Sequence, residues 1–216
     1  MLRLLLIWIC LAGHAQAGAW PRDVGDGFLS FSTITKEPRS LSDPMILSSL
    51  YAEYGLHPGL TLGLDAGYDD LGQYKAILFV TLPIDAMGDR TKLAFEFGAG
   101  AVNNRFVLRP GLSIGRGVTL WQNPGWLALD TRAEIRPDTG DVLLASDITL
   151  GVSPWEKSKI IFQIQAGGTF ESPPWIRFAP SFVHEIKPGR HLEIGGTAGL
   201  QNAESFGFKI GFWREF

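Results

Sequence analysis

The chain has 216 residues, a hydrophobic fraction of 45% and a formal net charge of −3. This length suits a single domain. The slightly acidic balance argues against a nucleic-acid-binding protein, because no basic run or aromatic-basic stripe offsets it. After residue 17, no stretch reaches the roughly 18 apolar residues that a membrane-spanning helix needs.

The first 17 residues have the pattern of a secretory signal peptide. Arg3 gives an early positive charge, residues 4–12 form an apolar run too short for a membrane anchor, and Ala15-Gln16-Ala17 places small residues at a cleavage site. Cys10 suggests a lipoprotein, but the residue before it is an isoleucine where lipidation needs a small side chain. We therefore expect cleavage after Ala17, leaving 18–216 as one domain without cysteine in an oxidising compartment.

The remaining chain alternates apolar and polar residues in segments of strand length, separated by residues typical of turns. Breaks such as Asp70-Leu71-Gly72 and Asn103-Asn104 supply positive φ or preset a turn. A tilted strand of this length can cross a bilayer, and an even count returns both termini to one side. The predicted strands are 27–35, 46–56, 60–69, 74–84, 91–102, 105–118, 126–136, 141–152, 160–170, 175–186, 191–201 and 206–216.

The two faces of most predicted strands differ in polarity. Leu127 and Leu129 alternate with Asp130 and Arg132, for example. Segment 74–84 is instead apolar on both faces, which predicts packing rather than water on its inner side.

Two prolines, Pro110 and Pro180, fall inside predicted strands. Each removes one donor from the hydrogen-bond ladder, and a closed barrel has no edge strand to accommodate them. They predict bulges or shifted strand boundaries at these positions.

A soluble β-sandwich alternates in the same way and is the main alternative fold. Aromatic residues near the predicted strand ends favour a membrane barrel instead, because they suit the two girdles at a membrane surface. The predicted girdle residues are Trp121, Trp126, Trp155, Trp175, Tyr54, Tyr68 and Phe106.

The last predicted strand ends the chain on an aromatic residue, with Phe208, Ile210, Phe212 and Phe216 on one face. This strand resembles the C-terminal signature of bacterial outer-membrane β-barrels in general. The resemblance implies an all-β fold, a transmembrane antiparallel up-and-down β-barrel of about 12 strands in the outer membrane of a Gram-negative cell. It also implies that these four residues form the insertion signal, with the outer-membrane insertion machinery and outer-membrane lipid as partners.

In such a barrel the polar faces point into the lumen. We expect a passive, narrow porin-like pore for small hydrophilic solutes, with both signs of charge on its wall. A structural or assembly-related barrel with a lumen filled by salt bridges is the alternative. The predicted pore-lining residues are Glu53, Asp65, Lys92, Glu96, Arg109, Asp130, Arg132, Glu134, Asp147, Arg177, Glu193 and Lys209.

An outer-membrane lipid hydrolase is a further alternative and needs a serine, a histidine and a polar orienting group within hydrogen-bond reach. The histidines after the leader are His57, His184 and His191. Ser181 and His184 are three residues apart, which places them on opposite faces of a strand. The sequence therefore predicts no enzyme, no catalytic residue, no metal site and no cofactor, and it leaves the solute and the oligomeric state open.

Overall fold

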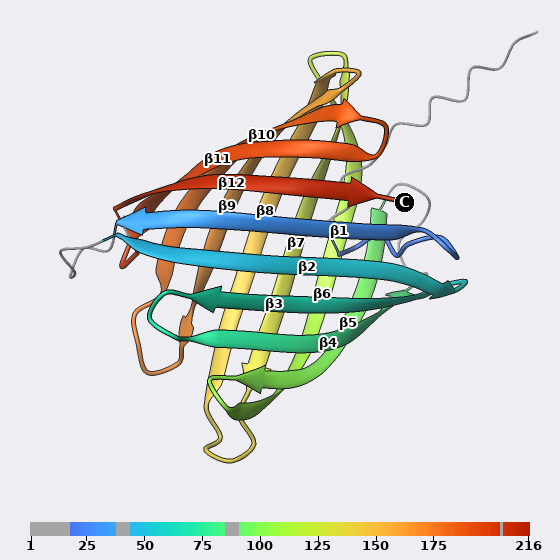
Figure 1. Ribbon diagram of the computed structural model, residues 1–216. Helices are drawn as coiled ribbons and strands as arrows, with labels where there is room; N and C mark the ends of the chain where they lie inside the picture. The colour runs from blue at the N-terminus through green and yellow to red at the C-terminus, as the bar shows by residue number, and fades with distance from the viewer. Residues whose placement is uncertain (1–17, 38–43, 85–90, 204) are drawn as a thin grey trace, which may run out of the picture.

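The protein forms a closed antiparallel barrel of twelve strands, in which each strand pairs with its sequence neighbours and β12 pairs with β1 (Figure 1). No helix within the described part of the chain is long and apolar enough to span a membrane. The computed structural model describes residues 18–37, 44–84, 91–203 and 205–216.

The strands agree with the predicted segments to within three residues at each end. The predicted signal peptide and most of the two connections after β1 and β4 lie outside the described residues. The strands are β1 (Gly27–Glu37), β2 (Met45–His57), β3 (Leu60–Asp69), β4 (Tyr74–Ile84), β5 (Thr91–Val102), β6 (Arg105–Leu120), β7 (Asn123–Ile135), β8 (Val142–Trp155), β9 (Ser158–Thr169), β10 (Trp175–Lys187), β11 (Arg190–Gln201) and β12 (Phe206–Glu215).

The boundary between β6 and β7 is the clearest difference from the prediction. Asn123, Pro124 and Gly125 have the composition of a turn, but they begin β7. The turn is formed by Trp121 and Gln122, whose φ angles are 47° and 67°. Trp121 does not signal a left-handed conformation, so the sequence placed this turn at residues 122–125, slightly too late in the chain.

The predicted bulges at Pro110 and Pro180 are wrong. The β6–β7 register is the same at Leu108 and Gly111, on both sides of Pro110, and the β10–β11 register is likewise unshifted across Pro180. Each proline leaves the ladder unpaired toward one neighbour only, because it lacks a single N–H donor.

The exterior of the barrel is apolar on all twelve strands. A soluble sandwich would bury these side chains in a core, whereas here they cover the outer wall. The exterior is therefore suited to lipid rather than water. The exposed apolar side chains include Phe31, Tyr54, Leu62, Leu78, Phe97, Leu112, Leu129, Ile148, Phe162, Phe182, Ile194 and Ile210.

Five of the predicted girdle residues are exposed: Tyr54, Tyr68, Phe106, Trp121 and Trp155. The prediction is wrong for two others. Trp126 is only 7% exposed, and the ring of Trp175 stacks under Arg177 with its centroid 4.9 Å from the guanidinium carbon. Both tryptophans alternate in phase with inward-facing charges, Trp126 with Asp130 and Trp175 with Arg177, so period-two geometry places them inside.

Candidate functional site: the barrel lumen

The lumen has two ends, which differ in what fills them. We call the end where β1 begins and β12 finishes the terminal end, and the other the opposite end. The N-terminal segment, Gly18–Asp26, enters the barrel at the terminal end: Ala19 and Arg22 are buried, whereas residues 23–26 are exposed. Its main chain pairs with β2, because Gly25 donates to the carbonyl of Gly55 at 3.0 Å and Gly55 donates to that of Asp26 at 3.0 Å.

Arg22 fixes the N-terminal segment to the wall. Its Nε donates to Glu53 at 2.8 Å, and its backbone N–H donates to the hydroxyl of Thr61 at 2.8 Å. The guanidinium also lies over the ring of Phe28, 4.8 Å from the centroid. Because Arg22 and Glu53 are both buried, this charge-assisted pair is shielded from solvent.

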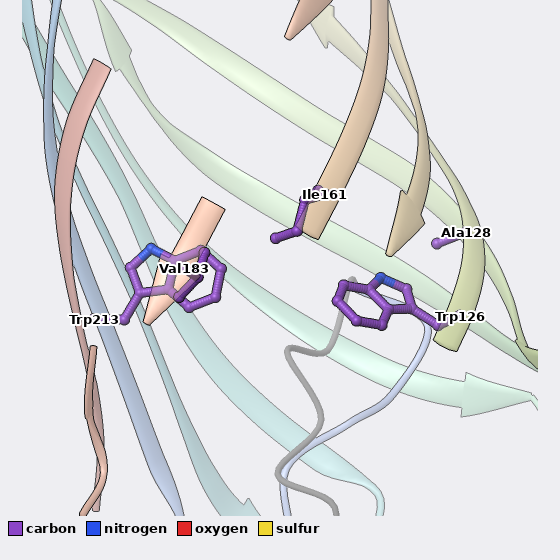
Figure 2. Close-up of a cluster of buried hydrophobic side chains, with 5 residues drawn as sticks. All are labelled: Trp126, Ala128, Ile161, Val183 and Trp213. Carbon is purple, nitrogen blue, oxygen red and sulfur yellow. The ribbon is translucent and has the colours of Figure 1, made fainter. Parts of the chain in front are cut away.

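A group of apolar side chains narrows the lumen near the terminal end. We call Trp126, Ala128, Ile161, Val183 and Trp213 the terminal cluster. Figure 2 shows Trp126 and Trp213 reaching into the interior from different walls of the barrel.

Local sequence makes room for the terminal cluster. Gly151 lies beside Trp126, and a Cβ at that glycine would collide with the indole ring. Trp20 of the N-terminal segment and Phe28 of β1 pack against the cluster. Phe28 meets Trp213 edge-to-face with centroids 5.8 Å apart.

An ion-pair network occupies the lumen beside β2–β6. Arg109 of β6 donates to Glu96 of β5 at 2.9 Å and to Asp65 of β3, and it is 1% exposed. Lys75 binds the same Asp65 oxygen at 2.8 Å, and Arg132 approaches Glu96 at 3.5 Å. Five strands, β3–β7, are thus tied together by charges of alternating sign.

Apolar and aromatic side chains complete this part of the lumen. Ile77 and Phe79 of β4 are buried, which confirms the predicted packing on the inner side of segment 74–84. Arg109 lies over the Phe79 ring. The ring of Tyr51 packs against the Phe79 ring at a tilt, with the two centroids 5.6 Å apart. We call the region beside β2–β6 the filled half of the lumen.

The rest of the lumen contains a cavity of about 270 Å³. Its wall is built by β1, Tyr51 of β2 and the strands β7–β12, and we call it the open half. Since a water molecule takes about 30 Å³ in the liquid, this space has room for roughly nine waters. The cavity is just below the range of about 300–1,000 Å³ typical of ligand pockets, so it suits a small solute.

A row of polar side chains crosses the open half from β8 to β10. Gln163 donates to the hydroxyl of Thr149 at 3.0 Å, and Gln165 donates to Gln163. Arg177 donates in turn to Gln165. The row presents the amide groups of Gln163 and Gln165 to the cavity, and these are suited to hydrogen bonding with hydroxyl or carboxylate groups of a solute.

Glu193 joins the open half to the terminal cluster. It accepts hydrogen bonds from Lys209 at 2.8 Å and from the indole N–H of Trp213 at 3.0 Å. Glu193 is only 2% exposed, so both donors are needed to offset the free-energy cost of burying its charge.

The structure places the twelve predicted pore-lining residues in four settings. Asp130, Arg132, Asp147, Glu193 and Lys209 line the cavity, and Arg177 reaches it through Gln165. Asp65, Glu96 and Arg109 belong to the filled half, and Glu53 holds Arg22. Lys92 is exposed near the terminal end, and Glu134 lines a separate pocket at the opposite end. Their part in solute passage stays a prediction.

Sequence reasoning missed several residues of the lumen. Arg22 precedes the first strand, so no face alternation marked it. The sequence placed Trp126 in a girdle and Trp213 on the inner face of the last strand, but it did not bring the two into one cluster. Trp126 is an even number of residues from the inward-facing Asp130, and this spacing identifies it as a lumen residue.

A serine–histidine pair also forms at the terminal end, but not the pair considered from the sequence. The β9–β10 pairing brings Ser158 to His184, with 2.9 Å between Oγ and Nδ1. Among the described residues no carboxylate hydrogen-bonds His184, so the pair lacks the orienting group of a hydrolytic triad. In the same ranges, no group of three or more His, Cys, Asp or Glu side chains is placed to hold a metal ion.

No protein-family model matches the sequence, and no curated protein matches it. Among solved structures, the KdgM porin aligns with a TM-score of 0.66 at 10% identity, covering 88% of this chain and 99% of that one. A structure of the KdgM porin in complex with disordered oligogalacturonate gives 0.68 at 10% identity with the same coverage. The COG4313 outer membrane channel from Pseudomonas putida F1 gives 0.57 at 12% identity, covering 94% and 100%. The likeness shows the fold: this chain has the closed twelve-stranded barrel of outer-membrane porins and channels.

Proposed function

We propose that the protein is a narrow outer-membrane channel through which small hydrophilic solutes pass along the open half of the lumen. The observation that carries this proposal is the cavity of about 270 Å³, whose wall combines carboxylates, cations and amides inside an apolar exterior. A wall of both signs favours no single charge strongly, and it offers polar solutes the hydrogen bonds that they lose on leaving water.

The named neighbours support the proposal without fixing the solute. KdgM is a porin with an oligogalacturonate complex, and COG4313 is a channel. The cavity here holds Asp130, Asp147 and Glu193 as well as Arg132 and Lys209. We therefore propose small, uncharged or zwitterionic solutes, moving down their concentration gradient, as the substrates of this channel.

Purified protein in a planar bilayer should give discrete conductance steps. Arg132→Gln removes a cation from the cavity wall and should shift the reversal potential in a salt gradient toward cation selectivity, whereas Asp147→Asn should shift it toward anions. Arg105→Gln is the matched control, because Arg105 pairs with Asp138 at the opposite end and is half exposed. Selectivity that is unchanged in both lumen variants would contradict passage along the open half.

A sealed structural barrel is the second candidate function, because the filled half and the terminal cluster already occupy much of the lumen. It predicts complete electrical silence of correctly folded protein in the same bilayer assay.

We infer that the protein is not a lipid hydrolase, since Ser158 and His184 lack an orienting carboxylate among the described residues. Residual lipase activity that is lost on Ser158→Ala would contradict that inference.

A further inference from the structure

One oxygen of a buried carboxylate in the open half lacks a hydrogen-bond partner. Asp130 of β7 is 6% exposed, and among the described residues no group hydrogen-bonds its Oδ1. Asp147 of β8 stands directly opposite it in the ladder. Like charges in opposed positions destabilise a sheet, and a buried unpaired charge adds a further cost. Arg132, the cation on β7, interacts electrostatically with Asp130, but its Nε lies 3.5 Å from Glu96.

Gly18, the first described residue, lies against this carboxylate. A methyl group built on its Cα would be 3.1 Å from Oδ1 of Asp130 and 2.9 Å from Oγ of Ser113. These are hydrogen-bond distances for a nitrogen at the same point. Since Gly18 has no Cβ, that space is free.

An amino group can occupy this space if Gly18 begins the chain. The N–Cα bond is about 1.46 Å and a Cα–C bond about 1.52 Å, so a nitrogen and a methyl carbon reach almost the same point. The amine of a first residue turns freely about its Cα–C bond, because no preceding peptide restrains it. One such rotation brings the nitrogen to the position between Asp130 and Ser113.

We propose that cleavage after Ala17 creates a cation that supplies the hydrogen bond that Oδ1 of Asp130 lacks. The new α-ammonium group of Gly18 binds Asp130 and Ser113 and anchors the N-terminal segment across the lumen. Together with Arg22 on Glu53, it gives the segment one charged anchor at its start, on β7, and another at its middle, on β2. The proposal rests on the predicted cleavage site and not on transport.

The test uses mature protein purified from outer membranes in detergent. Intact mass should show a chain that begins at Gly18. The α-amine is then acylated at neutral pH, and mass spectrometry follows its rate against the exposed Lys157. An ammonium group that is bound to a carboxylate stays protonated and does not react. We therefore expect acylation to be about tenfold faster in Asp130→Asn than in the wild type, which corresponds to a difference of one unit in the pKa of the amine.

Two further variants complete the test. Asp138→Asn removes a carboxylate at the opposite end and should leave the rate at the wild-type value. An alanine inserted after Ala17 moves the amine by up to about 3.5 Å and should also accelerate acylation, which keeps the test decisive if Asp130→Asn does not fold. Equal rates in the wild type, Asp130→Asn and the extended chain, or a mature chain with another first residue, would overturn the proposal.

Discussion

Arg109 is the central cation of the filled half of the lumen. Its guanidinium binds carboxylates from two other strands and lies over the ring of Phe79. Lys75 and Arg132 each pair with one of these carboxylates, whereas Arg109 alone bridges both. This cation on β6 therefore contributes most to keeping the carboxylates of β3 and β5 inward.

Replacing Arg109 with methionine should lower the free energy of unfolding by about 3–5 kcal/mol, because two buried carboxylates lose a partner. Urea unfolding in detergent or lipid vesicles measures the change. Arg105→Met on the same strand is the matched control, and since that pair is half exposed it should cost about 0–1 kcal/mol. Similar values for the two variants would contradict this account.

At the scale of elements, β12 closes the barrel and also ends the chain. The ladder between β1 and β12 continues past the last strand residue, because Gly27 donates to the carbonyl of Phe216 at 2.6 Å and Phe216 donates to that of Gly27 at 3.0 Å. Phe208, Ile210, Phe212 and Phe216 are all exposed on the outer face. That this stripe is an insertion signal stays a prediction.

Phe216→Ala should reduce the fraction of the protein that is assembled in the outer membrane, since it removes the terminal aromatic residue of that signal. Heat-modifiable gel mobility of membrane fractions measures assembly. Phe170→Ala removes an exposed aromatic residue at the opposite end and serves as the control. The purified Phe216→Ala protein should still refold in detergent, because its main-chain bonds to Gly27 remain. Normal assembly of this variant in cells would show that β12 carries no such signal.

At the scale of the whole molecule, the lumen is asymmetric around the barrel and along it. Charges and aromatic rings fill the side beside β2–β6, while the side formed mainly by β7–β12 keeps a cavity. Along the axis, the N-terminal segment and the terminal cluster narrow one end. A solute that crosses the barrel must therefore pass the terminal cluster.

Trp126→Ala should increase the single-channel conductance, because it removes a large ring from that constriction without removing a charge. Planar bilayer recording measures the step size. Trp121→Ala is the matched control, since Trp121 is 83% exposed in the turn at the terminal end and should leave the step unchanged. Equal steps in both variants would mean that ions do not pass the terminal cluster.

The sequence by itself determined the number of strands, most of their boundaries and, for most strands, which face points inward. Side-chain alternation is a local property of an extended backbone, so it can be read from neighbouring residues. Boundaries were missed where residues with weak turn preference, Trp121 and Gln122, adopt positive φ.

Only the tertiary structure decided what fills the lumen. Arg109 meets a carboxylate 44 positions away in the chain, and Arg22 meets one 31 positions away. Which charges pair, and which face a cavity, depends on the register and tilt of strands that converge from distant parts of the sequence. Alternation specifies that Asp130 points inward, but the curvature of the closed barrel brings Gly18 to it.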